Sequence, residues 1–275
     1  FRTRRSRQLI RHGAQSFSVS GTTIDPEGTK NRLSLQLSDG SLNPRLNGSR
    51  AKSMADLAQK LPVHIIEPNT HSLVEGPPSG RRGFLDWGVF HVEQGYLEAW
   101  RKYRRTLGQR NSALKKGEGR QMLDIWTATL VESAEPVEKL RARYVAQIGS
   151  LLQPIGQQLL NEAVSLEYRS GWDGSSSFKE ALEASWHKDC AMRTTSVGPH
   201  RADLVLRING RRVREEVSRG QQKLLAAALV LAQTELFVAT CENAGILLVD
   251  DPAAELDGDS VARLMAAVEV LVLLL

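Results

Sequence analysis

The stretch that decides the fold covers residues 215–233 and reads EEVSRGQQKLLAAALVLAQ. A polar start leads directly into a segment that is apolar on nearly every side, which predicts a helix buried on several faces. Ser218 and Gln221 stand three residues apart at its start and match a capping box. Because a cap needs neither Arg219 nor Gly220, we expect an exposed turn whose backbone N–H groups suit a phosphate.

Downstream, residues 246–260 read ILLVDDPAAELDGDS. Four apolar residues before two carboxylates predict a central parallel strand, and ligands of such sheets bind beyond the carboxyl ends of the strands. At that end, Asp250 can organise Mg²⁺ and Asp251 can orient an attacking water. An acidic pair can also simply end a buried strand before Pro252. The SRGQQ segment upstream and AELD immediately downstream favour the chemical interpretation.

Outward from these segments, the pattern indicates one α/β unit interrupted by helices. Period-two alternation in residues 16–24 and 32–38 predicts a hairpin, and residues 202–210 predict a strand that ends in an Asn-Gly turn. Residues 85–149 carry apolar side chains at helical spacing. We therefore expect a discontinuous α/β lobe of residues 1–84 and 164–275 and a helical lobe of residues 85–163.

The helical part contains a strongly basic stretch, residues 101–120. The formal net charge of the chain is +5, which permits nucleic-acid binding without demanding it. A solvated outer helix face explains the stretch as well as phosphate contact does. Under the second interpretation the candidate DNA-binding residues are Arg101, Lys102, Arg104, Arg105 and Arg110.

The remaining composition bears on compartment and completeness. The two cysteines are too few for a disulfide framework, and no apolar run approaches the length of a membrane span, so we expect a cytoplasmic protein with no membrane partner. The chain begins on Phe1 and closes within an apolar run, so we expect both ends to be truncated.

Several motifs carry a family resemblance. VSRGQ resembles the signature motif of an ABC-type ATPase head, ILLVDD its Walker B strand and AELD its D-loop. The segments GRRGFLDWGVFH, AWRKYRRTLGQRNSALK and GPHRADL resemble the bacterial recombination mediator family RecF over nearly the whole chain. The resemblance implies an α/β, P-loop NTPase-like head with an inserted helical lobe.

By the same resemblance, the protein binds DNA and ATP, dimerises around nucleotide, and works with RecO and RecR to place RecA at single-strand gaps during repair and replication and in the SOS response. The γ-phosphate of ATP held by the opposite subunit would meet Ser218, Arg219, Gly220 and Gln221. Asp250 would hold Mg²⁺ through water and Asp251 would be the catalytic carboxylate. Asp257 would line the dimer interface.

The sequence also departs from the pattern of ABC heads. No Walker A motif occurs, so we expect this chain to lack hydrolysis and the full-length protein to be a slow DNA-dependent ATPase, since both Walker B carboxylates are aspartates. His200 is expected to make a structural hydrogen bond. Two alternatives stay open: an SMC-class head in another repair role, and a non-enzymatic scaffold that binds partner proteins.

Overall fold

The computed structural model describes residues 6–272, apart from residues 26, 39, 214–216 and 242–244. Phe1, Glu215 and the closing residues 273–275 therefore lie outside the described residues. The chain divides into two compact units: unit 1 comprises residues 1–64, 241–248 and 275, and unit 2 comprises residues 65–240 and 249–274. The expected division at residues 84 and 164 stays a prediction.

Unit 1 is built on an antiparallel meander, which confirms the predicted hairpin. Strand β1 pairs with β2 from Ser16 opposite Ser38 to Ile24 opposite Lys30. The turn between them is held by Asp25, whose carboxylate accepts from the Thr29 N–H at 2.7 Å. The elements of this unit are η1 (Ser6–Leu9), β1 (Ser16–Ile24), β2 (Lys30–Ser38), β3 (Ser41–Leu46), β4 (Ser49–Arg50) and α1 (Met54–Lys60).

Strands β5 (Val63–Ile66) and β9 (Ile246–Val249) form a separate two-stranded sheet. The Ile246 N–H donates to the Pro62 carbonyl, and the Asp250 N–H donates to the Ile66 carbonyl. The hydrogen bonds therefore progress in the same direction along both strands, and the pair is parallel as predicted. The prediction of a central, buried strand is wrong for the described residues. There β9 pairs with β5 alone, which leaves Ile246 and Leu248 exposed.

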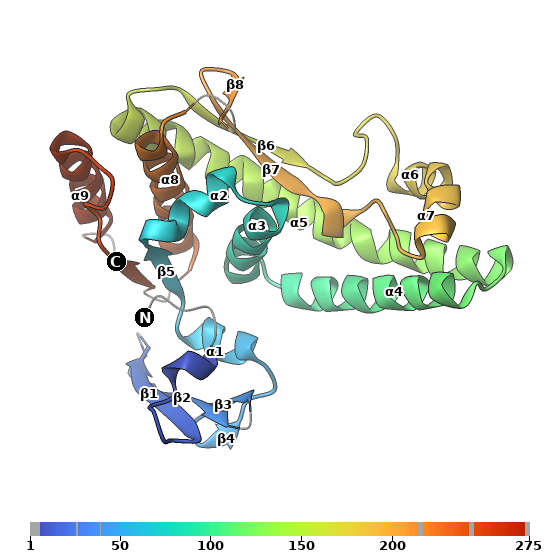
Figure 1. Ribbon diagram of the computed structural model, residues 1–275, viewed down its shortest axis with the longest axis horizontal. Helices are drawn as coiled ribbons and strands as arrows, with labels where there is room; N and C mark the ends of the chain where they lie inside the picture. Colours follow the sequence, from blue (N-terminus) through green and yellow to red (C-terminus); the bar gives the residue numbers. More distant parts are fainter. Residues whose placement is uncertain (1–5, 26, 39, 214–216, 242–244, 273–275) are drawn as a thin grey trace. The chain divides into compact units, whose positions relative to one another are not determined.

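Unit 2 is organised around two long helices, α5 (Arg120–Leu160) and α8 (Arg219–Thr240). Figure 1 shows α4 (Tyr96–Lys116) antiparallel beside α5 and strands β6 and β7 lying along α5. The turn between α4 and α5 uses Gly117, whose φ of 69° is left-handed and favours glycine. The remaining helices of this unit are η2 (Pro68–His71), α2 (Ser72–Glu75), α3 (Pro78–Val92), α6 (Phe178–Ala184), α7 (Trp186–Met192), η3 (Pro199–Arg201) and α9 (Gly258–Val272).

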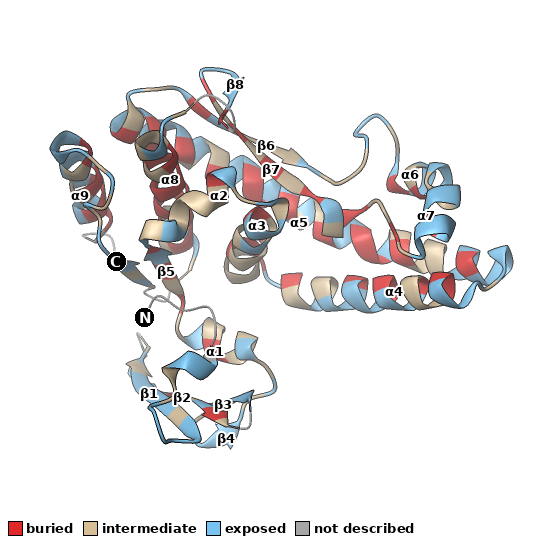
Figure 2. Cartoon of the chain, in the orientation of Figure 1, coloured by how far each residue is buried: buried red, intermediate tan, exposed pale blue. Residues whose placement is uncertain are grey.

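Helix α8 is the core helix that its composition predicts. Residues Leu224 through Thr234 are all buried, as Figure 2 shows in red. It is long and apolar enough to cross a membrane, yet 72% of its most apolar window is buried within the protein. At its crossing with α3 and α5, the Gln233 amide donates to Tyr144 at 2.9 Å and to the Phe84 carbonyl at 3.1 Å. A Cβ at Gly88 would collide with both Tyr144 and Gln233, so only glycine allows this close approach.

The three-stranded sheet of unit 2 covers α5 and is antiparallel, with strand order β6-β7-β8 (Val164–Arg169, Asp203–Ile208 and Arg211–Arg212). The predicted Asn209-Gly210 turn is confirmed by positive φ angles of 49° and 77°. Residues 178–192 form two short helices, α6 and α7, which meet at Ser185.

Candidate functional site

The start of α8 has the capping box that the sequence predicts. The Gln221 N–H donates to Ser218 Oγ at 3.2 Å, and the Ser218 N–H donates to Gln221 Oε1 at 3.0 Å. Arg219 and Gly220 follow as the first two helical residues, whose amides point out of a helix end by construction. Ser218 and Arg219 are exposed, and Gly220 and Gln221 are half-buried. This end of a buried helix is therefore capped and partly open to solvent.

Gly220 is not required by packing inside the chain. A Cβ there would stay 3.8 Å from the Glu255 carbonyl and from Leu256, an ordinary van der Waals separation. Its φ is also not left-handed. A methyl group would thus fit within this protein, so packing among the described residues does not account for the glycine.

The acidic pair follows β9 directly, as predicted. Asp250 and Asp251 are both exposed, and Asp251 has a φ of 48°, a left-handed conformation that a non-glycine residue adopts at some cost. Both residues line a small cavity of about 20 Å³ together with Thr70 and Lys223. Such a cavity has room for about one water molecule and none for a nucleotide.

Lys223 connects the two segments. It lies in α8 close behind the capping box, and its ammonium group contacts the Ala254 carbonyl and the Glu255 carboxylate, the latter at 3.4 Å. The first turn of α8 and the loop after β9 are therefore neighbours within unit 2. The sequence places these segments apart, and the structure brings them together.

Asp257 caps the start of α9, a role that the sequence did not predict. One of its oxygens accepts from the Ser260 N–H and the other from the Ser260 hydroxyl, both at 2.8 Å. These bonds to the Ser260 backbone and side chain lower the pKa of Asp257. The residue is thus the cap of α9 and stays ionised.

The described residues do not form a complete metal site. No three histidine, cysteine, aspartate or glutamate side chains gather within this part of the chain. Mg²⁺ commonly takes only one or two carboxylates and completes its shell with phosphate oxygens and water. Asp250 and Asp251 fit that partial role, because both are exposed carboxylates that directly follow strand β9.

The basic stretch divides between two environments. Four of its residues, Arg101, Lys102, Arg104 and Arg105, are exposed on α4, whose outer face is pale blue in Figure 2. The assignment of Arg110 to a DNA-binding face is wrong, because its side chain is fully buried against Asp189 at 2.8 Å. The same guanidinium also donates to the hydroxyls of Thr127 and Thr195.

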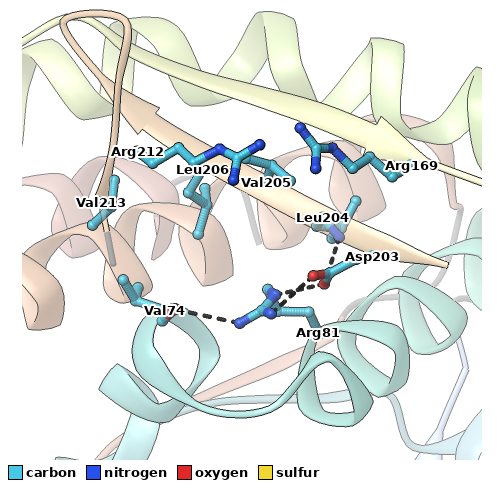
Figure 3. A pocket seen from close by; sticks show the side chains of 9 residues that line it. All are labelled: Val74, Arg81, Arg169, Asp203, Leu204, Val205, Leu206, Arg212 and Val213. Atoms are coloured by element: carbon cyan, nitrogen blue, oxygen red, sulfur yellow. Dashed lines mark hydrogen bonds and ion pairs between the residues drawn. The ribbon is translucent and has the colours of Figure 1, made fainter. Parts of the chain in front are cut away.

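Two further arginine–aspartate pairs tie the helices of unit 2 to the segment GPHRADL, and the sequence did not predict them. Arg81 binds both oxygens of Asp203, at 2.7 and 3.0 Å, beside a cavity of about 130 Å³ shown in Figure 3. Arg141, buried on α5, donates to Asp86 at 2.6 Å and to the Pro199 carbonyl at 2.7 Å.

His200 makes the structural hydrogen bonds that were expected of it. The Thr195 carbonyl lies 3.0 Å from Nε2 and can only accept, so Nε2 carries the proton. Nδ1 then accepts from the Tyr103 hydroxyl at 2.7 Å. Burial, together with nearby arginines, lowers the pKa of His200 to about 4, so the ring is neutral at physiological pH.

Comparison with known proteins identifies close relatives, although no family model matches the chain. The DNA replication and repair protein RecF of Hydrogenovibrio crunogenus is 38% identical over 261 residues, which cover 94% of this chain and 72% of that protein. RecF of Edwardsiella ictaluri is 38% identical over 259 residues, with the same two coverages.

Solved structures give the same result. A structure described as the recombination mediator protein RecF with ATP in the RecFOR pathway matches 97% of this chain and 76% of its own, with 25% identity and a TM-score of 0.86. A second RecF structure, described as RecF-ATPrS, matches 94% of this chain and 74% of its own, with 25% identity and a TM-score of 0.82.

Proposed function

The chain belongs to the RecF family of DNA replication and repair proteins, and from this premise we propose that it is a DNA-binding switch that two copies close around ATP. Its fold is the α/β, ABC-type ATPase head of that family. In the proposed function it acts in the cytoplasm with RecO and RecR and helps load RecA at single-strand gaps, including during the SOS response. The solved RecF structures belong to a recombination mediator of the RecFOR pathway, which supports such partners.

The nucleotide contacts proposed for this chain start at α8. Ser218, Arg219, Gly220 and Gln221 would receive the γ-phosphate of ATP held by the opposite subunit. The outward-pointing amides of a helix start favour an anion, and the buried body of α8 holds them in place. The absence of any internal need for glycine at Gly220 supports close approach by another molecule.

Asp250 and Asp251 would take part in metal binding and in ATP hydrolysis. Asp250 would hold Mg²⁺ through a bound water, and the cation would neutralise charge on the phosphates. Asp251 would orient the attacking water. Because both groups are aspartates, we propose slow turnover for the full-length protein. Asp257, which already caps α9, would line the dimer interface with its backbone loop.

One observation carries this proposal: the first turn of α8 and the loop after β9 lie against each other, with Lys223 bound to Ala254 and Glu255. This contact holds the residues that would meet a partner's nucleotide next to the residues that follow the chain's own acidic pair. A change at the dimer boundary would move both together.

The test is ATP-dependent dimerisation of the full-length protein, measured by analytical ultracentrifugation with Mg²⁺ and ATP. Ser218→Arg should bind ATP like the wild type and remain monomeric, because a long cation would fill the space for the phosphate. Asp251→Asn should dimerise normally and lose hydrolysis. Normal dimers of Ser218→Arg, or a wild type that stays monomeric with bound ATP, would instead favour the scaffold alternative.

A further inference from the structure

Three arginines from three elements meet around the turn of residues 199–202. Arg82 of α3 donates from Nη1 to the Ala202 carbonyl at 2.9 Å, which places it next to Arg201 of η3. Arg104 of α4 follows Tyr103, whose hydroxyl contacts His200 at 2.7 Å. The hydrogen bonds of their neighbours thus hold Arg82, Arg104 and Arg201 in one region of unit 2.

The carboxylates of this region are already occupied. Asp203 is bound at both oxygens by Arg81, as Figure 3 shows, and Asp86 is bound by Arg141. Glu138 accepts from the Tyr168 hydroxyl at 2.7 Å, and burial raises its pKa to about 7, which reduces its negative charge near neutral pH.

As a result, the nearby carboxylates are engaged by arginines other than these three. Within the described part of the chain, Arg82, Arg104 and Arg201 form no ion pair. His200, which lies among them, is neutral. The pKa of Arg82 is lowered, first by burial and further by Arg141 and Arg201, although Asp203 opposes this. A bound anion would relieve this repulsion.

Trp100 fixes the α4 side of the cluster. The guanidinium of Arg104 lies 5.7 Å from the centroid of its ring and that of buried Arg141 lies 5.0 Å from it. Trp100 also stacks on Tyr103 at 5.6 Å. Arg104 is therefore partly preorganised, and it is continuous along α4 with the exposed Lys102 and Arg105.

We propose that Arg82, Arg104 and Arg201 bind backbone phosphates of DNA and extend the basic face of α4 across α3 and the turn at residues 199–201. This inference rests on the proposed function, which requires DNA binding. Guanidinium groups pair with phosphate oxygens in planar, often bidentate geometry. The cations are spread over three elements, and DNA presents its charges in an extended row, whereas an acidic peptide concentrates its charges on a short segment.

The experiment measures binding of the full-length protein to a fluorescent DNA duplex by anisotropy over a series of NaCl concentrations. The double variant Arg82→Gln/Arg201→Gln should bind more weakly, and the slope of log affinity against log salt should fall by about one per arginine. The matched control, Lys179→Gln/Lys188→Gln, removes two exposed cations from α6 and α7 and should keep the wild-type slope. Circular dichroism and ATP-dependent dimerisation should be unchanged in both variants.

Three outcomes would count against the inference or against its premise. An unchanged salt slope in the Arg82/Arg201 variant, with DNA binding lost when α4 is altered, would overturn the inference and leave the proposed function intact. A wild type without DNA binding would overturn both. A fluorescent poly-glutamate peptide serves as a second probe in the same measurement. If the Arg82/Arg201 variant loses binding to this peptide but keeps binding to the duplex, the cluster binds an acidic protein segment and the DNA assignment is overturned.

Discussion

Arg105 and Arg110 lie on the same helix and carry the same side chain, yet one is exposed and the other is fully buried. The difference comes from helix phase. Tyr103, Leu107 and Leu114 form the buried stripe of α4, and position 110 falls on that stripe, three residues after Leu107. Spacing alone could have revealed this. The sequence could not supply the partner, because Asp189 is distant along the chain and reaches Arg110 only in the fold.

Arg110→Ala should destabilise the protein by about 3–5 kcal/mol, since it leaves the Asp189 carboxylate buried without its counter-charge. Urea unfolding followed by tryptophan fluorescence measures this for unit 2, which holds all the tryptophans. Arg105→Ala on the exposed side of the same helix is the matched control and should change stability by less than about 0.5 kcal/mol. Equal effects of the two substitutions would contradict the assignment of Arg110 to the interior.

Gly220→Ala should separate folding from dimerisation. The monomer has room for a methyl group, and alanine favours a helix over glycine by about 0.5–1 kcal/mol, so thermal stability should hold or rise. If a partner's phosphate approaches Gly220 closely, overpacking there should cost about 1–3 kcal/mol and weaken ATP-dependent dimers by about fivefold to 150-fold. Sedimentation with ATP measures the dimer. Wild-type dimer affinity in this variant would exclude close approach at Gly220.

At the scale of elements, sequence patterns predicted the features that depend on residues close together in the chain. The β1–β2 hairpin, the capping box of α8, the Asn209-Gly210 turn and the parallel strand before Asp250 follow from spacing and turn chemistry. Properties that depend on distant neighbours were not predicted. The exposure of β9 depends on which strands flank it, and the break between α6 and α7 occurs at Ser185, which carries no strong breaker signal.

The exposed face of α4 allows a test at this scale. Lys102→Glu/Arg105→Glu should weaken DNA binding and flatten its salt dependence by at least about one unit, because both side chains point away from the core. The measurement is anisotropy with a labelled duplex between low and physiological salt. Lys179→Glu/Lys188→Glu, the same charge change on α6 and α7, is the control. Identical slopes for wild type and the α4 variant would indicate a merely solvated helix face.

At the scale of the whole molecule, buried titratable groups of unit 2 act in opposite directions. Burial lowers the pKa of His91 and of His200 from 6.5 to about 4, so between those pH values the unfolded chain binds protons that the folded chain does not. Acidification through this window therefore destabilises the fold. Burial raises the pKa of Glu138 from 4.5 to about 7, so the folded chain holds a proton that the unfolded chain loses, and acidification stabilises it.

The balance predicts opposite responses from two substitutions. Each proton difference contributes a slope of about 1.4 kcal/mol per pH unit to the free energy of unfolding. Between about pH 5 and 6, His200→Gln should remove most of one such slope and make stability less sensitive to acid, whereas Glu138→Gln should remove the opposing contribution and make stability more sensitive. Urea unfolding at several pH values, followed by tryptophan fluorescence, measures both slopes. The exposed His187→Gln is the control and should keep the wild-type slope. Parallel curves for all four proteins would mean that neither buried group changes its proton affinity on folding.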